Sequence, residues 1–221
     1  MKNILFFVLL TLPAIFQAQT TTRWNMALVN SYDGCYRFTK AHSNLDWLKK
    51  EMDSTETWKS GFSSGLNASF QVTKNLALVG GFTYANRGQQ LKSNALLGMS
   101  YYRTTYQFIE VPVFARFSKD LSENSKLQLG VGPQILFQIN TVAHYLLANS
   151  NNAQKIRVNE SSNHTFKIGT IVNLSYQTKL AKCTDFQCGV VYKQQLTALS
   201  SGNVQRLPFS LGVQLGLVFH R

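Results

Sequence analysis

The chain has 221 residues and a formal net charge of +12, with few charged residues (14%) and many aromatic ones (12%). This length suits one domain, and after the N-terminal run no stretch approaches the ~18 apolar residues of a membrane helix. The basic balance comes without an Arg/Lys block interleaved with aromatics, which argues against nucleic-acid binding and leaves lipid phosphates as the expected counter-charge.

The N-terminus is typical of a secretory signal peptide. Lys2 precedes an apolar run from Ile4 to Phe16, and the small residue Ala18 follows. A positive charge, ~7–15 apolar residues and a small residue at the cleavage point are the features that such peptides share. We expect residues 1–18 to be removed and residues 19–221 to form one domain in the cell envelope.

The remainder of the chain alternates apolar residues with small or polar ones. After a less regular first strand within Trp24–Phe38, the alternation covers residues 62–72, 76–84, 109–117, 127–139, 166–176, 186–192 and 207–219. A period of two indicates extended strands with two unlike faces. The last segment is the strictest, and its length exceeds the ~9–11 residues that a tilted strand needs to cross a bilayer.

The connections between these segments alternate in length. Residues 73–75, 118–125 and 179–184 are short links, whereas residues 39–58, 88–103, 142–163 and 198–205 are longer loops. Outer-membrane barrels have short periplasmic turns and longer extracellular loops. We therefore predict an all-β fold, an eight-stranded antiparallel up-and-down transmembrane β-barrel, with ten strands as the alternative if residues 142–163 contain another hairpin.

The two faces differ in a way that favours a membrane barrel over a soluble secreted barrel. Gly, Ser, Asn and Gln dominate the unlike face, and such residues suit the narrow lumen of eight strands. The apolar face would then meet lipid. Aromatic residues near strand ends fit interfacial girdles; they are Tyr84, Tyr106, Phe117, Tyr176, Tyr192, Phe209 and Phe219.

Three motifs resemble one barrel family. Residues 106–117 read YQFIEVPVFARF, residues 130–133 read GVGP, and the segment 212–219 reads GVQLGLVF. This pattern is similar to the PorT-like outer-membrane β-barrel family, although its Gly-rich first strand is replaced here at residues 24–29. The resemblance implies a barrel in the bacterial outer membrane. Named members of the family assist protein secretion across that membrane, and the resemblance implies the same role for this chain.

Charged residues on the lumen face predict a buried network. Glu110 and Arg116 share this face but lie roughly 20 Å apart along the strand, too far for direct contact. A lone buried carboxylate is costly, so Arg87, Lys167 and Lys193 are candidate partners of Glu110. We expect a structural network, with an ion- or proton-conducting track as the alternative. Pro112, which lacks a donor, predicts a bulge or a break in the ladder.

The cysteines leave two alternatives open. Cys183 and Cys188 could form a disulfide across a hairpin turn, leaving Cys35 unpaired, or all three could be free thiols. The spacing supplies too few ligands for a metal, and we expect neither a metal nor another cofactor.

Two further sites are candidates at the extracellular rim. A lipid hydrolase would need a base beside a hydroxyl, and such residue types flank the third loop: His144, Glu160, Ser161, Ser162 and His164. Basic residues at the rims could bind lipopolysaccharide phosphates; they are Lys40, Lys59, Arg87, Lys92, Arg103, Lys155, Arg157 and Arg206.

The sequence as a whole favours a monomeric, non-enzymatic barrel of the outer membrane. We expect an accessory or anchoring role through contacts with envelope or secretion proteins. The alternatives are a barrel that binds a small apolar ligand or lipid and, third, a lipid hydrolase at the rim.

Overall fold

The computed structural model describes residues 24–41, 50, 54–94, 99–147, 154–157, 166–198 and 204–220. The predicted signal peptide lies outside these ranges. Among the described residues, no helix is both long enough and apolar enough to cross a bilayer.

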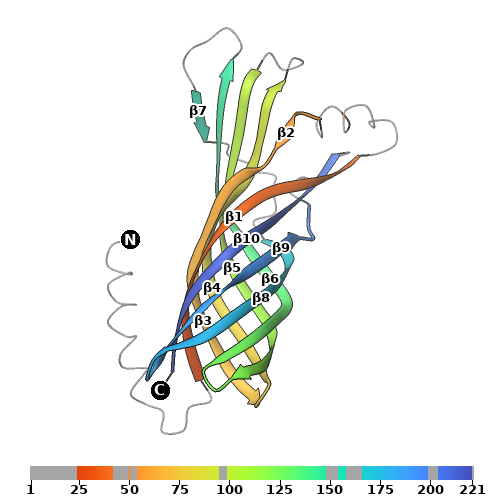
Figure 1. Cartoon of the computed structure of the whole chain (residues 1–221). Coiled ribbons are helices and arrows are strands. Elements are labelled where there is room, and N and C mark those ends of the chain that lie inside the picture. The colour runs from red at the N-terminus through yellow and green to blue at the C-terminus, as the bar shows by residue number, and fades with distance from the viewer. Residues whose placement is uncertain are drawn as a thin grey trace, which may run out of the picture.

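Eight long strands form a closed antiparallel barrel, as predicted (Figure 1). They are β1 (Trp24–Ala41), β3 (Lys59–Thr73), β4 (Leu76–Asn94), β5 (Met99–Ser122), β6 (Ser125–Leu147), β8 (Phe166–Ala181), β9 (Thr184–Gln195) and β10 (Val204–Phe219). Each long strand pairs with its neighbour along the chain, and β10 pairs with β1 to close the ring.

Two short strands extend the sheet without crossing the membrane. Strand β2 (Glu56–Thr57) pairs with the far end of β4, and β7 (Gln154–Arg157) pairs with the far end of β6. Strand β7 thus makes the additional hairpin that we considered for residues 142–163. It is an extension of β6, so the barrel keeps eight strands.

The strands are longer than the hydrophobic pattern predicted. Strand β5 has 24 residues, and at ~3.3 Å per residue it reaches about 80 Å, whereas ~9–11 residues cross a bilayer. Most of the loop predicted over residues 88–103 is strand, because β4 runs to Asn94 and β5 begins at Met99. Residues 88–94 of β4, 99–107 of β5 and 139–147 of β6, together with β7, form the part of the sheet that projects beyond the barrel (Figure 1). We call these residues the extracellular sheet.

The short links at the opposite end are tight turns. Thr73 pairs with Leu76, so only residues 74 and 75 connect β3 to β4. Residues 123–124 and 182–183 make the other two turns between described strands. These are the periplasmic turns of the barrel.

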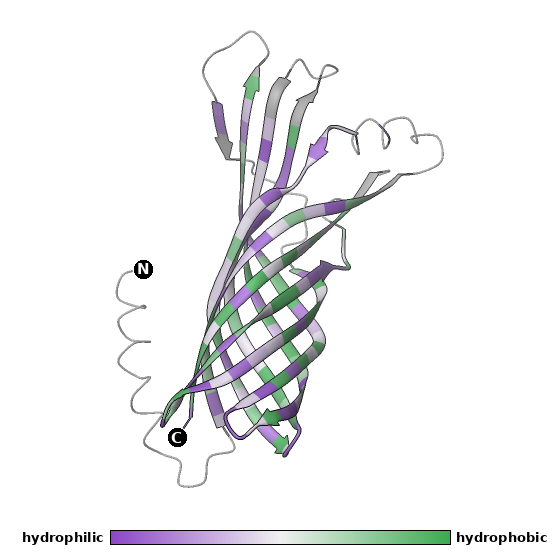
Figure 2. Cartoon of the chain, viewed as in Figure 1, coloured by the Kyte–Doolittle hydropathy of each residue, from purple (hydrophilic) through white to green (hydrophobic). Residues whose placement is uncertain are grey.

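Exposure alternates along each strand and places the apolar face outward. On β10, Val213 is 57% exposed and Leu215 is 49% exposed, while Ser210 on the lumen side is 1% exposed. The first strand, whose faces the sequence did not assign, follows the same rule, with Leu28 and Tyr32 outward and Asp33 inward. Figure 2 shows the resulting alternation of apolar and polar residues around the barrel.

Aromatic side chains gather near both edges of the apolar belt. Trp24 and Phe70 have ring centroids 5.0 Å apart at the periplasmic edge. At the extracellular edge, Phe209 contacts Phe38 at 4.6 Å and Trp58 at 5.7 Å. The prediction for Tyr106 was wrong, because this residue is buried among Phe108, Leu136 and Ala85. It occupies an even position of β5 and therefore shares the lumen face of Glu110.

The ladder is interrupted beside Pro112, as predicted. Between β4 and β5, Gly80 pairs with Val113 and the next pair is Thr83 with Glu110. Pro112 has no N–H for a ladder hydrogen bond. The register does not shift there, so the feature is a break rather than a bulge.

Lumen glycines make room for larger side chains on the neighbouring strand. A Cβ atom at Gly212 would overlap the Asp33 carboxylate, and one at Gly81 would overlap the Asn67 amide oxygen. Gly212 pairs with Asp33, and Gly81 pairs with Asn67. These small–large pairs let an eight-stranded barrel hold polar side chains inside a narrow lumen.

Candidate functional site

The centre of the lumen contains Glu110 between two cations. Its side chain is almost fully buried on β5, where it forms ion pairs with Arg87 of β4 and Lys193 of β9. The Lys193 Nζ atom lies 3.1 Å from Glu110 Oε2. Both cations belong to the set that the sequence offered as partners for this carboxylate.

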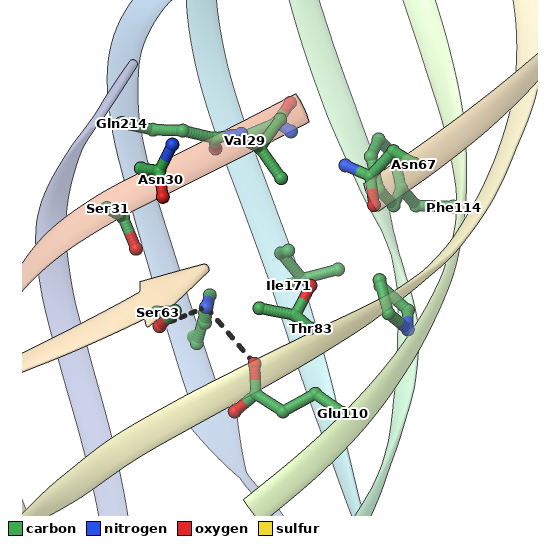
Figure 3. Close-up of a pocket in the computed structure, with 13 residues that line it drawn as sticks. Val29, Asn30, Ser31, Ser63, Asn67, Thr83, Glu110, Phe114, Ile171 and Gln214 are labelled. Atoms are coloured by element: carbon green, nitrogen blue, oxygen red, sulfur yellow. Dashed lines mark hydrogen bonds and ion pairs between the residues drawn. The ribbon is translucent and has the colours of Figure 1, made fainter. Parts of the chain in front are cut away.

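A hydrogen-bonded series continues from Lys193 to the opposite wall. The Lys193 ammonium donates to Ser63 Oγ at 3.0 Å, and the Ser63 hydroxyl donates to Asp33 Oδ2 at 2.7 Å. Dashed lines in Figure 3 mark the contacts of this ammonium with Ser63 and with Glu110. Strand β9 is adjacent to neither β3 nor β5 in the sheet, so Lys193 links walls that share no backbone hydrogen bonds. We call Asp33, Ser63, Arg87, Glu110 and Lys193 the cross-lumen network.

The charges of the cross-lumen network cancel. Asp33 and Glu110 supply two carboxylates, while Arg87 and Lys193 supply two cations, and all four side chains are buried. Removing one partner of a buried ion pair leaves an uncompensated charge, which costs about 3–5 kcal/mol. The network is therefore suited to hold the walls together, and it needs no counter-ion to be neutral.

The space beside this network is small. A cavity of about 20 Å³ is lined by Ser63, Asn67, Glu110, Asn173 and Lys193, among others (Figure 3). A single water needs ~10–15 Å³ measured in this way. The cavity can hold about one water molecule and is far too small for an organic ligand.

The other two predicted lumen residues lie apart from Glu110. Arg116 is buried nearer the periplasmic end, with its guanidinium carbon 5.6 Å from the centroid of the Phe114 ring. Lys167 is buried on the lumen side of β8, where its backbone pairs with that of Leu136. Neither is among the ion pairs of Glu110 in the described structure.

A second buried ion pair closes the extracellular end of the lumen. Arg37 of β1 donates from Nε to Glu56 of β2 at 2.6 Å and from Nη1 to Gln89 of β4 at 2.5 Å. This cluster was not predicted, because Glu56 and Gln89 lie in segments that the sequence predicts to be loops. The available signal was Arg37 itself, a charged residue within the apolar-rich first strand.

A third cluster lies at the periplasmic mouth. The His220 ring contacts Asp185 at 2.6 Å through Nε2 and Asn25 at 3.0 Å through Nδ1. Gln177 donates to the same carboxylate at 2.5 Å. The cluster joins β1, β8 and β9 to the end of β10, so it reinforces the seam at which the barrel closes.

Of the two alternatives for the cysteines, a Cys183–Cys188 disulfide or three free thiols, the structure has the three free thiols. Cys183 lies in the turn before β9, whereas Cys188 lies inside that strand. Four residues of extended strand span about 13 Å, well beyond the ~7 Å that a disulfide allows between Cα atoms. Cys35 is buried in the lumen.

Of the five candidate hydrolase residues, the structure describes only His144. His144 is a strand residue of β6, and residues 160–162 and 164 lie outside the described part of the chain. Within the described ranges no group of three or more His, Cys, Asp or Glu side chains could hold a metal ion.

Of the eight basic residues predicted at the rims, four have described side chains, and these four fall into two groups. Lys59 and Arg87 are buried inside the barrel, so neither is a surface charge. Arg103 is half-buried and Lys155 is exposed, both on the extracellular sheet. For the remaining four, Lys40, Lys92, Arg157 and Arg206, the structure describes the backbone alone.

The geometry has counterparts among solved structures. Neisserial surface protein A is similar with a TM-score of 0.50 and 13% identity, over 92% of this chain and 100% of that one. The outer membrane protein OprG from Pseudomonas aeruginosa is similar with a TM-score of 0.50 and 11% identity, over 89% of this chain and 96% of that one. No protein-family model and no curated protein matches the chain. The likeness therefore concerns the fold, which is that of an outer-membrane β-barrel.

Proposed function

We propose that the protein is a non-enzymatic, monomeric barrel that anchors its extracellular sheet and loops in the outer membrane as an accessory component of the cell envelope. The observation that carries this proposal is the cross-lumen network. Lys193 and Glu110 meet in the middle of the lumen, and the adjoining cavity has about 20 Å³. A barrel filled in this way is a support rather than a conduit.

The alternative of a small apolar ligand in the lumen has less support. Ligand pockets have about 300–1,000 Å³ and are mostly apolar. The lumen cavity is far smaller, and its lining includes the charged residues Glu110 and Lys193.

The extracellular sheet supports a role in contacts with other macromolecules. Its strands continue the barrel strands, so partner-binding positions would be held by the same ladders as the membrane span. On the outward face of β5, the apolar positions end at Ile109, and the half-buried polar residues Gln107, Thr105 and Arg103 follow. A polar sheet beyond the membrane belt is suited to contact envelope proteins or extracellular molecules.

We further propose that the chain belongs to the PorT-like group and assists protein secretion. The supporting residues are those of the strand motif. Glu110 is the centre of the cross-lumen network, Pro112 lies at the ladder break, and Arg116 is a buried lumen cation. Because these residues fill the lumen, the motif would serve the architecture of the barrel. The proposed secretion role would then depend on the loops of the barrel.

Photo-crosslinking in intact cells tests the proposed role. A photoreactive amino acid at Gln107 probes the extracellular sheet, one at Asn124 probes a periplasmic turn, and one at Val113 is a control in the lipid belt. We expect Gln107 or Asn124 to capture a defined envelope or secretion protein, and Val113 to capture lipid. If all three positions give the same set of products, the protein has no specific partner at either end and the anchoring role is wrong.

A further inference from the structure

A row of basic side chains crosses the outward face of the extracellular sheet. Gln90 of β4 pairs with Arg103 of β5, Arg103 pairs with His144 of β6, and His144 pairs with Lys155 of β7. Directly paired residues lie on the same face with Cβ atoms about 4.5–5.5 Å apart. Four neighbouring strands thus place an amide, a guanidinium, an imidazole and an ammonium side by side. We call these four residues the basic row.

The described carboxylates are all elsewhere. Asp33 and Glu110 are buried in the lumen, and Asp120, Glu123 and Asp185 are at the periplasmic end. Glu56 of β2 lies next to β4, but it is buried and forms an ion pair with Arg37. No ion pair in the described structure involves Arg103 or Lys155. The Arg103 Nε atom is buried without a hydrogen-bond partner. The row therefore has positive charge that the described protein does not neutralise.

One buried cation of the barrel, Lys59, extends toward Asn86 on the outward face of β4. Lys59 leaves the lumen side of β3 where its ladder with β4 opens, and its ammonium lies 3.5 Å from the Asn86 side-chain oxygen. Lys59 precedes the lipid-facing part of β3, which begins at Phe62. Because Lys59 is buried, it is not part of the basic row.

The position of the row relative to the membrane indicates which anion it meets. Arg103 lies on the same face of β5 as Ile109, Val111 and Val113, three outward positions beyond the end of this apolar belt. This corresponds to about 20 Å along the strand, or about 14 Å in height for a strand tilted by ~45°. Long Arg and Lys side chains can extend back toward the headgroups. The face that meets lipid tails below therefore meets lipid headgroups at this level.

We propose that the basic row is a binding site for phosphate groups on a glycolipid of the outer leaflet. Arg103 would donate paired hydrogen bonds to phosphate oxygens, and Lys155 would supply a second charge-assisted contact. Strand β7 holds Lys155 in register because the Tyr145 hydroxyl donates to Gln154 Oε1 at 2.5 Å. This site rests on the orientation of the barrel in the membrane and does not depend on the proposed secretion role.

Lipid titration with the purified full-length protein tests the site. Diphosphorylated lipid A, dephosphorylated lipid A and inorganic phosphate are added in mixed micelles, and bound lipid is measured by native mass spectrometry. We expect the wild type to bind the diphosphorylated lipid at least about tenfold more tightly than the dephosphorylated one. The double variant Arg103→Gln/Lys155→Gln should lose this preference.

A matched variant separates the site from net charge. Lys119→Gln/Lys179→Gln removes the same charge from exposed positions near the periplasmic turns, and it should keep the wild-type preference. Both variants must show the heat-dependent gel mobility of a folded barrel. The proposal is overturned if Arg103→Gln/Lys155→Gln binds like the wild type, or if the control variant loses as much. It is also overturned if inorganic phosphate or polyglutamate competes as strongly as the lipid, because the site would then recognise a free anion or an acidic protein.

Discussion

The cations of the lumen and those on the outward face of the extracellular sheet differ in the partners that surround them. On the lumen side, Arg37 lies against Glu56, and both Arg87 and Lys193 lie against Glu110. The buried Arg116 is in none of the described ion pairs and lies over the Phe114 ring instead. On the outward face, Arg103 and Lys155 lack a described carboxylate partner. A cation that is removed from water needs compensation by the protein, whereas one at a membrane surface can be neutralised by water, salt or lipid phosphate. The difference identifies the lumen charges as structural and the outer charges as available.

Glu110→Ala is expected to produce the largest effect, because it leaves Arg87 and Lys193 buried without their carboxylate. The loss should be about 3–5 kcal/mol of unfolding free energy. Denaturant unfolding in lipid vesicles measures it, and Glu123→Ala in a periplasmic turn is the control, with a change near zero. Equal unfolding midpoints for Glu110→Ala and the wild type would show that the cross-lumen network does not stabilise the barrel.

Lys193→Ala should have a smaller effect on stability and a larger one on permeability. Glu110 keeps its ion pair with Arg87, so a loss of about 2 kcal/mol is expected. The lysine that crosses the lumen is gone, and water can fill the space. Planar-bilayer recordings should show little steady current for the wild type and for Lys179→Ala, and a raised current for Lys193→Ala. A wild type that already conducts as well as the variant would mean that the lumen is open.

His220→Ala tests the seam at the periplasmic mouth. The change removes the contacts with Asp185 and Asn25, and since the ring is partly exposed the loss should be about 1 kcal/mol or less. Unfolding in the same vesicles measures it, with Lys182→Ala as a nearby control. A loss of stability as large as that of Glu110→Ala would mean that contacts at the periplasmic rim stabilise the closed barrel as much as the cross-lumen network does.

The cysteines give the smallest expected change. Cys183 is exposed and should react with a maleimide in the folded protein, whereas the buried Cys35 should react after unfolding. Cys183→Ser should alter stability by less than about 0.5 kcal/mol, since it is a surface substitution. If Cys183 and Cys188 react only after a reductant is added, the two form a disulfide.

The membrane span was predictable because its signal is local. The alternation from Leu207 to Phe219 gives the faces of β10 without knowledge of any other strand. The alternation along β5 likewise places Tyr106 on the lumen face with Glu110. Its assignment to an interfacial girdle was wrong, because nearness to a strand end does not decide which face of the strand a residue occupies. The spacing of Cys183 and Cys188 left a disulfide and free thiols as equal alternatives, since closeness in sequence is not closeness in space along an extended strand.

The site was predictable only in part, because its contacts join strands that are distant in sequence. A buried carboxylate at Glu110 implied cationic partners, and the candidate set contained both Arg87 and Lys193. The choice between these and Lys167 depends on the register around the ring, which no local pattern gives. Glu56 and the outer part of β4 were missed because the hydrophobic alternation stops where the strands leave the lipid.

Spin-label accessibility at three consecutive positions of β10 tests the central claim that the apolar face meets lipid while the polar face fills a sealed lumen. Val213 and Leu215 are outward, and Gln214 between them lines the lumen cavity. In lipid vesicles, oxygen should relax labels at 213 and 215 strongly, and a water-soluble nickel chelate should reach none of the three. Access of the chelate to position 214 would reveal a water-filled pore, and access to positions 213 and 215 would show that the faces are reversed.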